Sequence, residues 1–287
     1  MWILLSFLTA FCEAAKDGLC KKGLQSMDSA TVSWAWKVFS LPFLLPAVLF
    51  LPIPEQLPAE FWLALLVGGG LNVAATLLYI KAIQLSDLSL TLPLLSLTPV
   101  FLLFTSPLLV GDIPSPAGYL GVIFIFLGTY LLGLSAGTGF WAPFRALLQD
   151  KGARLMFLVG LIWSIAANMD KIGVQASNVF FWAGSVQVFI SLGLSLALLL
   201  NIKGKKEQVS AHLPLLMIIG LVTAAGFIFQ MSAISIGLVP YIIAIKRTSI
   251  VLGVAIGGFF FQERDLPARL GSTLIMLLGV FLIAFFQ

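Results

Sequence analysis

The chain has 287 residues, of which 60% are hydrophobic and only 10% are charged, and its formal net charge is +4. Its mean hydropathy of +1.08 excludes an ordinary soluble domain, which could not bury so much apolar surface. Only helices and closed barrels satisfy their backbone hydrogen bonds in a bilayer, and the apolar runs are too long for barrel strands. We therefore expect an all-α integral membrane protein.

Ten apolar runs follow one another, each close to the roughly 20 residues that a membrane-spanning helix needs. Breaks rich in proline, glycine or charge separate them, as at Pro52 and Pro54. The first run begins at Met1 without a basic leader or a cleavage site, so we interpret it as a span and not as a signal peptide. We expect spans near residues 2–20, 31–52, 60–82, 88–110, 115–135, 154–174, 178–200, 213–235, 240–261 and 268–286.

The basic residues between these runs or at their ends concentrate around the loops that follow odd-numbered spans, and the loops after even-numbered spans contain none. Since positive charge is retained on the cytoplasmic side of a membrane, the odd-numbered loops should be cytoplasmic. With ten spans, both termini then face outward. The residues concerned are Lys21, Lys22, Lys81, Arg145, Lys151, Arg154, Lys203, Lys205, Lys206, Arg264 and Arg269.

The first predicted span carries charge deep in its apolar sequence, with Glu13 near the middle and Lys16 one turn later. A charge at the centre of a span costs at least roughly 2.5–3.5 kcal/mol on insertion scales, so it needs a partner, a wet cavity or a function. Without a partner, burial would favour the protonated carboxyl group, which suits proton or cation coupling. A pair with Lys16 or Lys37 would instead make Glu13 structural, and both interpretations stay open.

Further polar residues lie in the spans that would form a central cavity. Lys37 in the second span and Gln187 in the seventh are 150 residues apart, and both could line a cavity or form a hydrogen bond between helices. Taken singly, polar residues inside spans are more typical of helix packing or of the membrane interface than of ligand binding. Those in question are Asn72, Tyr79, Gln230 and Tyr241.

Cations also occur inside the sixth and ninth spans. Asn168 and Lys171 share a face of the sixth, and Lys246 and Arg247 are adjacent in the ninth, about two turns from its outer end. Three converging cations would attract an anion, because arginine offers a bidentate fork and lysine a point charge. Alternatively, Asp170 neutralises Lys171 while backbone carbonyls hold the other two cations, which leaves no site.

The sequence contains no glycine-rich phosphate loop, nucleophile elbow or paired-metal motif. Cys12 and Cys20, the only cysteines, lack metal-ligand spacing and are expected to be free thiols, and His212 is expected at the surface. We therefore predict no catalytic residue, no cofactor and no bound metal.

An internal repeat appears when the chain is shifted by 150 or 151 positions. Each copy holds five spans, an odd number, so the second copy must enter the membrane inverted. Inverted repeats typically place a substrate site at the midplane between two halves that rock against each other, although a duplication can also simply build a stable bundle. The matched pairs are Val38 and Val188, Phe39 and Phe189, Gly69 and Gly220, Ala74 and Ala225, Ala82 and Ala233, Ile83 and Ile234, Asp112 and Glu263, Pro116 and Pro267, Ala117 and Ala268, and Gly128 and Gly279.

The repeated region resembles a known family. Residues 82–128, with acidic Asp112, and their copy 233–279, with Glu263, are similar to the repeated pattern of the ten-helix EamA-type branch of the drug/metabolite transporter superfamily. In that pattern an acidic turn separates a fourth helix from a glycine-bearing fifth helix. The resemblance covers nearly the whole chain and implies one repeat over residues 1–137, a loop over 138–151 and a second repeat over 152–287.

Two shorter resemblances concern charged residues. Glu13 followed by Lys21 is similar to the first helix of the small multidrug resistance proteins, in which that glutamate binds protons and cationic drugs. The Lys246-Arg247 pair resembles the Lys-Arg pair in the ninth helix of the plastid phosphate translocators, and Lys171 falls where those proteins have a phosphate-binding lysine. The neighbouring residues depart from the translocator pattern. The second resemblance implies a phosphorylated or otherwise anionic substrate.

We expect a secondary active transporter, not an enzyme, that moves a small polar metabolite, anionic or phosphorylated, by alternating access. Two other functions stay open: export of amino acids, amines or drugs with Glu13 as the binding carboxylate, and a flippase or accessory role for a lipid-linked anion. Glu13 is the expected ion-coupling residue. The expected substrate site comprises Lys171, Lys246, Arg247, Asn168, Lys37, Gln187, Tyr241 and Asn72.

The expected partners are a small-molecule substrate, the lipid bilayer and a proton or an exchanged counter-substrate, but no nucleic acid. We expect a monomer or a homodimer. The compact length and the lack of a cleavable leader favour a multi-pass protein of the bacterial inner (plasma) membrane.

Overall fold

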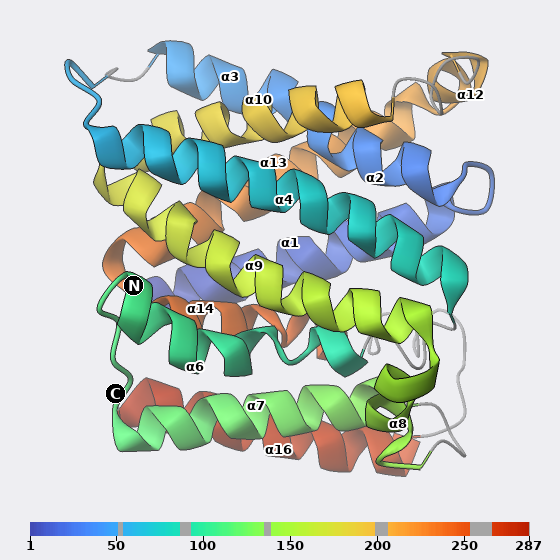
Figure 1. The fold of residues 1–287 in the computed structure, drawn as a ribbon, viewed down its shortest axis with the longest axis vertical. Coiled ribbons are helices and arrows are strands. Elements are labelled where there is room, and N and C mark those ends of the chain that lie inside the picture. The colour runs from blue at the N-terminus through green and yellow to red at the C-terminus, as the bar shows by residue number, and fades with distance from the viewer. Residues whose placement is uncertain (51–53, 87–92, 135–138, 199–205, 253–265, 287) are drawn as a thin grey trace.

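The computed structural model describes residues 1–50, 54–86, 93–134, 139–198, 206–252 and 266–286, and the regular structure in these ranges is entirely helical. The longer helices run side by side across the view in Figure 1, and both termini lie at the same end of the bundle. The protein is thus an all-α integral membrane protein. Its helices are α1 (Trp2–Gly23), α2 (Ser29–Val38), α3 (Leu41–Phe50), α4 (Ala59–Leu85), α6 (Thr98–Leu109), α7 (Pro116–Gly133), α8 (Ala142–Gln149), α9 (Lys151–Gln175), α10 (Val179–Ala197), α12 (Lys206–Ala211), α13 (Leu213–Ile236), α14 (Val239–Lys246) and α16 (Leu266–Phe285).

The two ends of the bundle carry different loops. The loops at 111–115 and 176–178, which follow even-numbered predicted spans, lie at the end that holds both termini (Figure 1). The loop at 24–28 and the short helices α8 and α12 lie at the opposite end, as the basic residues in odd-numbered loops require. We call the end with both termini the outer end, following the predicted topology.

The observed helices follow the predicted spans closely. Helices α1, α4, α7, α9, α10, α13 and α16 each occupy one predicted span. Four of them, α4, α9, α10 and α13, are long and apolar enough to cross a bilayer by length and composition alone. Parts of the second, fourth and ninth predicted spans, at 51–53, 87–92 and 253–265, lie outside the described residues, as does the predicted acidic turn at Glu263.

Three predicted spans are interrupted instead of continuous. A turn at residues 39–40 separates α2 from α3, a turn at 96–97 precedes α6, and a turn at 247–248 follows α14. The last two turns are 151 residues apart, so they occupy equivalent positions of the two repeats. Interrupted helices at matching positions of inverted halves are the local structure from which transporters build their substrate sites.

The repeat is also visible in the packing. A Cβ atom at Gly69 would collide with the ring of Phe189, and one at Gly220 would collide with the backbone of Phe39. These two contacts are equivalent under the shift of 150 or 151 residues, because Gly69 matches Gly220 and Phe39 matches Phe189. Small residues at such positions let membrane helices approach closely, so each repeat uses its glycine to seat an aromatic residue of the other repeat.

Helices α7 and α16, the last of each repeat, pack against each other along one edge of the bundle (Figure 1). A Cβ atom at Gly121 would meet the carbonyl oxygen of Gly279, and one at Gly279 would meet the carbonyl oxygen of Gly121. The two backbones are therefore nearly in contact, and the pair is self-complementary as inverted repeats require.

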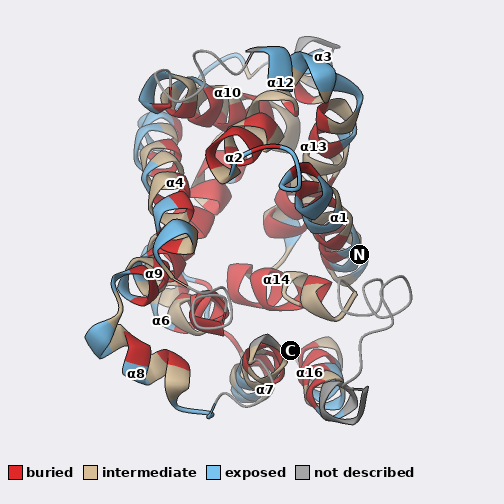
Figure 2. Ribbon diagram, turned by 90° about the vertical axis from the view of Figure 1, so that its right-hand side faces the viewer, coloured by how far each residue is buried: buried red, intermediate tan, exposed pale blue. Residues whose placement is uncertain are grey.

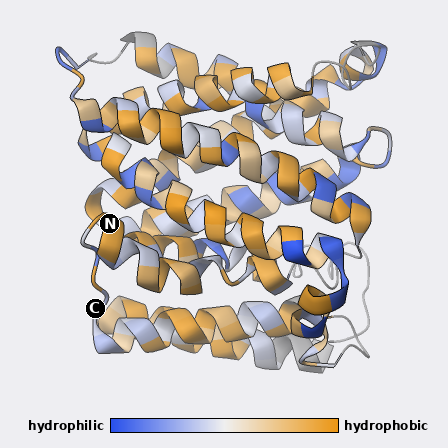
Figure 3. Cartoon of the chain, in the orientation of Figure 1, coloured by the Kyte–Doolittle hydropathy of each residue, from blue (hydrophilic) through white to orange (hydrophobic). Residues whose placement is uncertain are grey.

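The remaining long helices surround a common centre. Figure 2 looks from the predicted cytoplasmic end and shows α1, α2, α4, α9, α13 and α14 arranged around this centre, with buried residues turned inward. Apolar residues predominate along the helices in Figure 3. Large apolar side chains on the outer faces, such as Phe11, Leu66, Leu192 and Leu277, are 54–66% exposed, as expected for residues that face lipid.

A buried ion pair closes the outer end between the two repeats. Lys171 Nζ lies 2.5 Å from Asp112 Oδ1 and also donates a hydrogen bond to the carbonyl oxygen of Gly237 at 3.1 Å. The second carboxylate oxygen of Asp112 accepts a hydrogen bond from the backbone N–H of Val239 at 2.8 Å. Gly111, with a φ of 71°, makes the turn that brings Asp112 from the first repeat to these residues of the second.

We predict that Gly69→Ala lowers the free energy of unfolding by about 1–3 kcal/mol, because the added methyl group overpacks the contact with Phe189. Gly70→Ala is the matched control, since a Cβ atom there meets open space. Thermal unfolding in detergent, followed by circular dichroism, measures both. Equal stability of the two variants would contradict the proposed close contact.

We predict that Lys171→Met lowers the free energy of unfolding by about 3–5 kcal/mol, because it leaves the buried charge of Asp112 without its partner. The double variant Lys171→Met/Asp112→Asn should recover most of this loss, since it removes both charges and keeps an acceptor for the N–H of Val239. The same unfolding assay applies. A double variant as unstable as the single one would show that the charge pair is not the cause.

Candidate functional site

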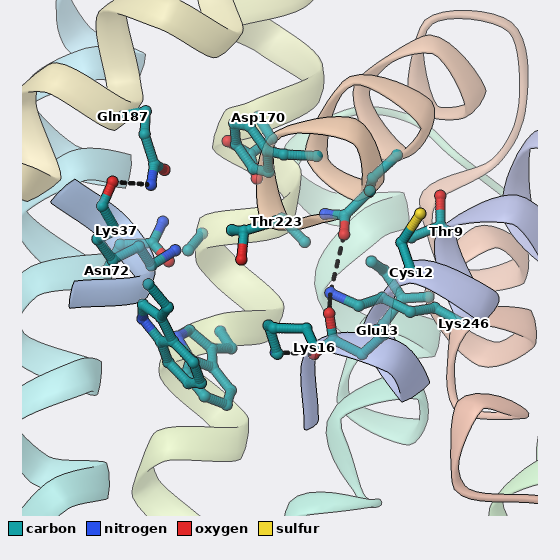
Figure 4. Close-up of a pocket in the computed structure, with 18 of the residues that line it drawn as sticks. Thr9, Cys12, Glu13, Lys16, Lys37, Asn72, Asp170, Gln187, Thr223 and Lys246 are labelled. Carbon is teal, nitrogen blue, oxygen red and sulfur yellow. Dashed lines mark hydrogen bonds and ion pairs between the residues drawn. The ribbon is translucent and has the colours of Figure 1, made fainter. Parts of the chain in front are cut away.

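A cavity of about 160 Å³ lies between α1, α2, α4, α9, α10, α13 and α14. It has room for a small solute together with water. Figure 4 shows Glu13, Lys16 and Lys246 on one side of it, Lys37, Asn72 and Gln187 on the other, and Asp170 and Thr223 between these groups. The charged residues of its wall are Glu13, Lys16, Lys37, Asp170, Lys246 and Arg247.

Helix α1 contributes one polar stripe to the wall. Thr9, Cys12, Glu13 and Lys16 follow the spacing of one helix face, and all four line the cavity. Because the rest of α1 is largely apolar, this stripe turns toward the cavity while the apolar faces turn toward neighbouring helices or lipid. Cys12 and Cys20 are both free thiols, as predicted.

Glu13 is held by two ammonium groups. Its Oε1 atom lies 2.6 Å from Lys16 Nζ, and its Oε2 atom lies 3.5 Å from Lys246 Nζ. Lys16 also lies 3.2 Å from Asp17 and stands over the ring of Trp36, 4.4 Å from the ring centroid. Of the partners considered for Glu13 in the sequence, the structure therefore selects Lys16 and adds Lys246, and it does not select Lys37.

The interrupted helix α14 places two cations at the cavity. Lys246 ends α14 and donates a hydrogen bond to Gln230 Oε1 at 2.9 Å. Arg247 lies in the turn that follows, and its Nη2 atom donates to the hydroxyl of Thr98 at 3.1 Å, so that it links the two interrupted helices. The Nε–H of Arg247 is buried and has no hydrogen-bond partner among the described residues. The guanidinium thus has an unused donor at the cavity wall.

Lys37 and Gln187 meet on the opposite wall. Gln187 donates to the carbonyl oxygen of Lys37 at 3.0 Å and to the hydroxyl of Ser40 at 2.8 Å, where the turn after α2 leaves these acceptors available. The ammonium group of Lys37 has no ion pair or hydrogen bond among the described residues, and it stands over the ring of Phe227, 6.0 Å from the ring centroid. Asn72 lines the same wall and donates to the carbonyl oxygen of Gly68 at 3.0 Å. Gln187 thus both joins two helices and faces the cavity.

Asp170 and Lys171 point in different directions, which rules out the alternative in which they pair. Asp170 faces the cavity and accepts a hydrogen bond from Trp182 Nε1 at 3.0 Å. Lys171 pairs with Asp112 at the outer end and is not part of the cavity wall. Successive residues of a helix are about 100° apart, which is enough to separate them. The sequence predicted that Lys171 would converge with Lys246 and Arg247, but the structure places it away from them.

Two other predicted site residues lie away from the cavity. Asn168 is fully buried between α6 and α9, where it accepts from Ser106 at 2.7 Å and donates to Thr105 at 3.1 Å. The hydroxyl of Tyr241 accepts from the backbone N–H of Ser115 at 2.9 Å, and its ring stacks on Trp2. Lys171 and Tyr241 border a second, outer hollow of about 530 Å³ instead. In this conformation Asn168 and Tyr241 pack helices together, and Lys171 closes the outer end.

Several residues of the wall were not nominated from the sequence. The stripe of α1 could have identified Thr9 and Cys12 from their spacing to Glu13. Trp36 and Trp163 carried no such signal, because aromatic residues are common throughout membrane helices. In the described part of the chain, no group of three His, Cys, Asp or Glu side chains is placed to hold a metal ion.

The cavity carries more positive than negative groups. Four cations, Lys16, Lys37, Lys246 and Arg247, face two carboxylates, Glu13 and Asp170. Two of the cations share Glu13, while neither Lys37 nor Arg247 forms an ion pair within the part of the chain that the structure describes. The site can therefore hold an anion without first losing all of its internal pairs.

Comparison with known proteins agrees with the architecture. The model of the EamA-like transporter family matches twice, over residues 1–134 and 150–285. An uncharacterized transporter of Archaeoglobus fulgidus is 22% identical over 284 residues, covering 98% of this chain and 97% of that protein. A crystal structure described only as that of a protein has a TM-score of 0.81 at 15% identity, covering 100% of this chain and 99% of the other, which supports the fold. Because the family model matches both halves, the chain belongs to the EamA-like transporter family.

Proposed function

We propose that this protein is a secondary active transporter of a small anionic metabolite, phosphorylated compounds included, and that it works by alternating access. The observation that carries this proposal is the charge of the cavity, where four cations face two carboxylates and the cations Lys37 and Arg247 form no ion pair. An anion can supply the missing counter-charge, whereas a cation would add a further unpaired positive group.

The interrupted helix α14 offers the best position for the anionic group. Arg247 has a free donor at Nε and can turn a bidentate face toward a carboxylate or phosphate. Lys246 lies beside it, and its ion pair with Glu13 is long, at 3.5 Å. A substrate oxygen could replace Glu13 as the partner of Lys246. Lys37, Asn72 and Gln187 on the opposite wall would contact the other end of the solute.

Alternating access would use the two repeats as the moving parts. The inverted repeats meet at the cavity, and the pair of Asp112 and Lys171 closes the outer end between them. Opening outward would require this pair to separate while the opposite end closes. Substrate binding would favour the exchange between the two states by neutralising the cations that both states share.

The arrangement of Glu13 supports the anion over an amine or a cationic drug. A cationic solute that used Glu13 would have to displace Lys16 at 2.6 Å and Lys246 at 3.5 Å, and would leave Lys246 without its counter-ion and Lys16 with Asp17 alone. An anion that binds Lys246 needs to displace only the longer contact, between Lys246 and Glu13. Glu13 would then remain with Lys16 as the internal counter-ion of the empty carrier.

The direct test uses purified protein in lipid vesicles. Uptake and counterflow are measured against phosphorylated sugars, carboxylates, amino acids and quaternary amines, with empty vesicles as the control. We expect transport of anions alone. Transport limited to amines or amino acids would overturn the anionic substrate, and movement of a lipid-linked anion without transport of soluble solutes would favour the flippase alternative.

We predict that Lys246→Gln and Arg247→Gln each weaken anion binding by about 10- to 100-fold, because each removes a charge-assisted hydrogen bond of about 1.5–3 kcal/mol. Lys22→Gln is the matched control, since Lys22 is exposed at the end of α1 and away from the cavity. Vesicle uptake at increasing anion concentration measures the effect. Normal transport by either cavity variant would show that the anion does not bind there.

A second measurement reports binding without transport. In a Cys20→Ser background the remaining cysteine is Cys12, which lines the cavity. A bound anion should slow the reaction of Cys12 with a thiol reagent in the otherwise unchanged protein, and should not do so after Arg247→Gln. Equal protection in both proteins would place the anion elsewhere.

A further inference from the structure

Asp170 is a buried carboxylate that forms no ion pair with any cation of the described residues. It lies on the wall of the cavity, is 6% exposed, and receives one hydrogen bond, from Trp182 Nε1 at 3.0 Å. Trp182 itself is fully buried and rests against Gly173, so the donor is fixed in place. The adjacent cation Lys171 is occupied by Asp112. Asp170 therefore differs from Glu13, which has two ammonium partners.

The other walls of the cavity do not supply a partner either. The cations that act on Asp170 are Lys37 of α2 and Lys246 of α14. In neither case does the ammonium nitrogen lie within 4.0 Å of a carboxylate oxygen of Asp170, the distance that an ion pair requires. Arg247 on α14 and Glu13 and Lys16 on α1 complete the charged groups of the wall. The polar side chains that helices α4, α6, α10 and α13 present to the cavity are all neutral: Asn72, Thr98, Gln187, Thr223 and Gln230.

Protonation has opposite consequences at the two carboxylates of the cavity. A proton on Glu13 would leave Lys246 without its counter-ion and Lys16 with Asp17 alone. A proton on Asp170 would remove an unpaired buried charge and leave no cation orphaned, and the neutral acid could still accept the hydrogen bond from Trp182. Proton uptake is therefore easier to accommodate at Asp170 than at Glu13.

We propose that Asp170 is the proton-binding site of the carrier, and that a proton on Asp170 and an anion in the cavity are transported together. The coupling follows from charge and rests on the proposed anionic substrate. A proton on Asp170 leaves Glu13 as the one negative group facing four cations, so an anion binds more strongly. By linkage, the bound anion strengthens proton binding by the same factor. A monoanion that moves with one proton carries no net charge.

The proton site can be tested without any substrate. Infrared difference spectra between acid and alkaline buffer should show the C=O band of a protonated carboxylic acid in the wild type and in Glu13→Gln, and should lose it in Asp170→Asn. Asp170→Asn retains an acceptor for Trp182, so the variant should unfold at the same temperature as the wild type. A band that persists in Asp170→Asn and disappears in Glu13→Gln would overturn the assignment.

Coupling is tested in vesicles with inorganic phosphate as the probe. A pH gradient should drive phosphate accumulation by the wild type, but Asp170→Asn should reach only the equilibrium level. Phosphate exchange should lose its pH dependence in Asp170→Asn and stay at the rate that the wild type shows in acid. Asp170→Glu, which can titrate, should restore the pH dependence. Accumulation driven by the gradient in Asp170→Asn would overturn the proposal.

The two proposals fail in different ways. If the wild type moves no anion, the proposed function fails and the coupling fails with it, while the infrared spectra still decide whether Asp170 takes up the proton. If anion exchange depends on Lys246 and Arg247 but Asp170→Asn remains driven by the gradient, the proposed function stands and the role of Asp170 is wrong.

Discussion

A bilayer supplies no water to ionised groups, so each charge inside this bundle must have a counter-ion, a hydrogen bond or a cavity. The structure resolves this constraint in three ways. Lys171 and Asp112 form a buried pair that joins the repeats at the outer end. Glu13 and its two lysines form a looser cluster at the cavity, and Asp170 has only an indole hydrogen bond. The tightly paired charges hold the conformation, and the loosely paired ones remain available to a solute or a proton.

The repeat produces a symmetric scaffold with asymmetric chemistry. The turns at 96–97 and 247–248 are equivalent, as are the packed pairs of glycine and phenylalanine. The charges do not follow this symmetry, because Lys246 and Arg247 correspond to Leu95 and Ser96 in the first repeat. The first repeat instead contributes Lys16 and Lys37 at other positions, so both halves supply cations to the cavity without obeying the symmetry of the scaffold.

Much of this arrangement is readable in the sequence for physical reasons. Apolar runs of spanning length have one stable structure in a bilayer, so the positions of α1, α4, α9, α10 and α13 were predictable. A constant offset between repeats with an odd number of spans requires inversion. The costs of burying charge also singled out Glu13, Lys246 and Arg247, and all three line the cavity.

Only the tertiary structure decided which charges meet. Sequence spacing gives the depth of a residue and its face on one helix, but the rotation of each helix and the identity of its neighbours depend on packing across the whole bundle. Lys171, expected at the substrate site, therefore lies at the outer closure, and Asp170, which the sequence offered only as its partner, lies at the cavity. The sequence by itself determined an inverted-repeat membrane carrier with charge near its midplane, because solvent and symmetry act on every residue alike. Which carboxylate stays unpaired depends on contacts between helices far apart in the chain.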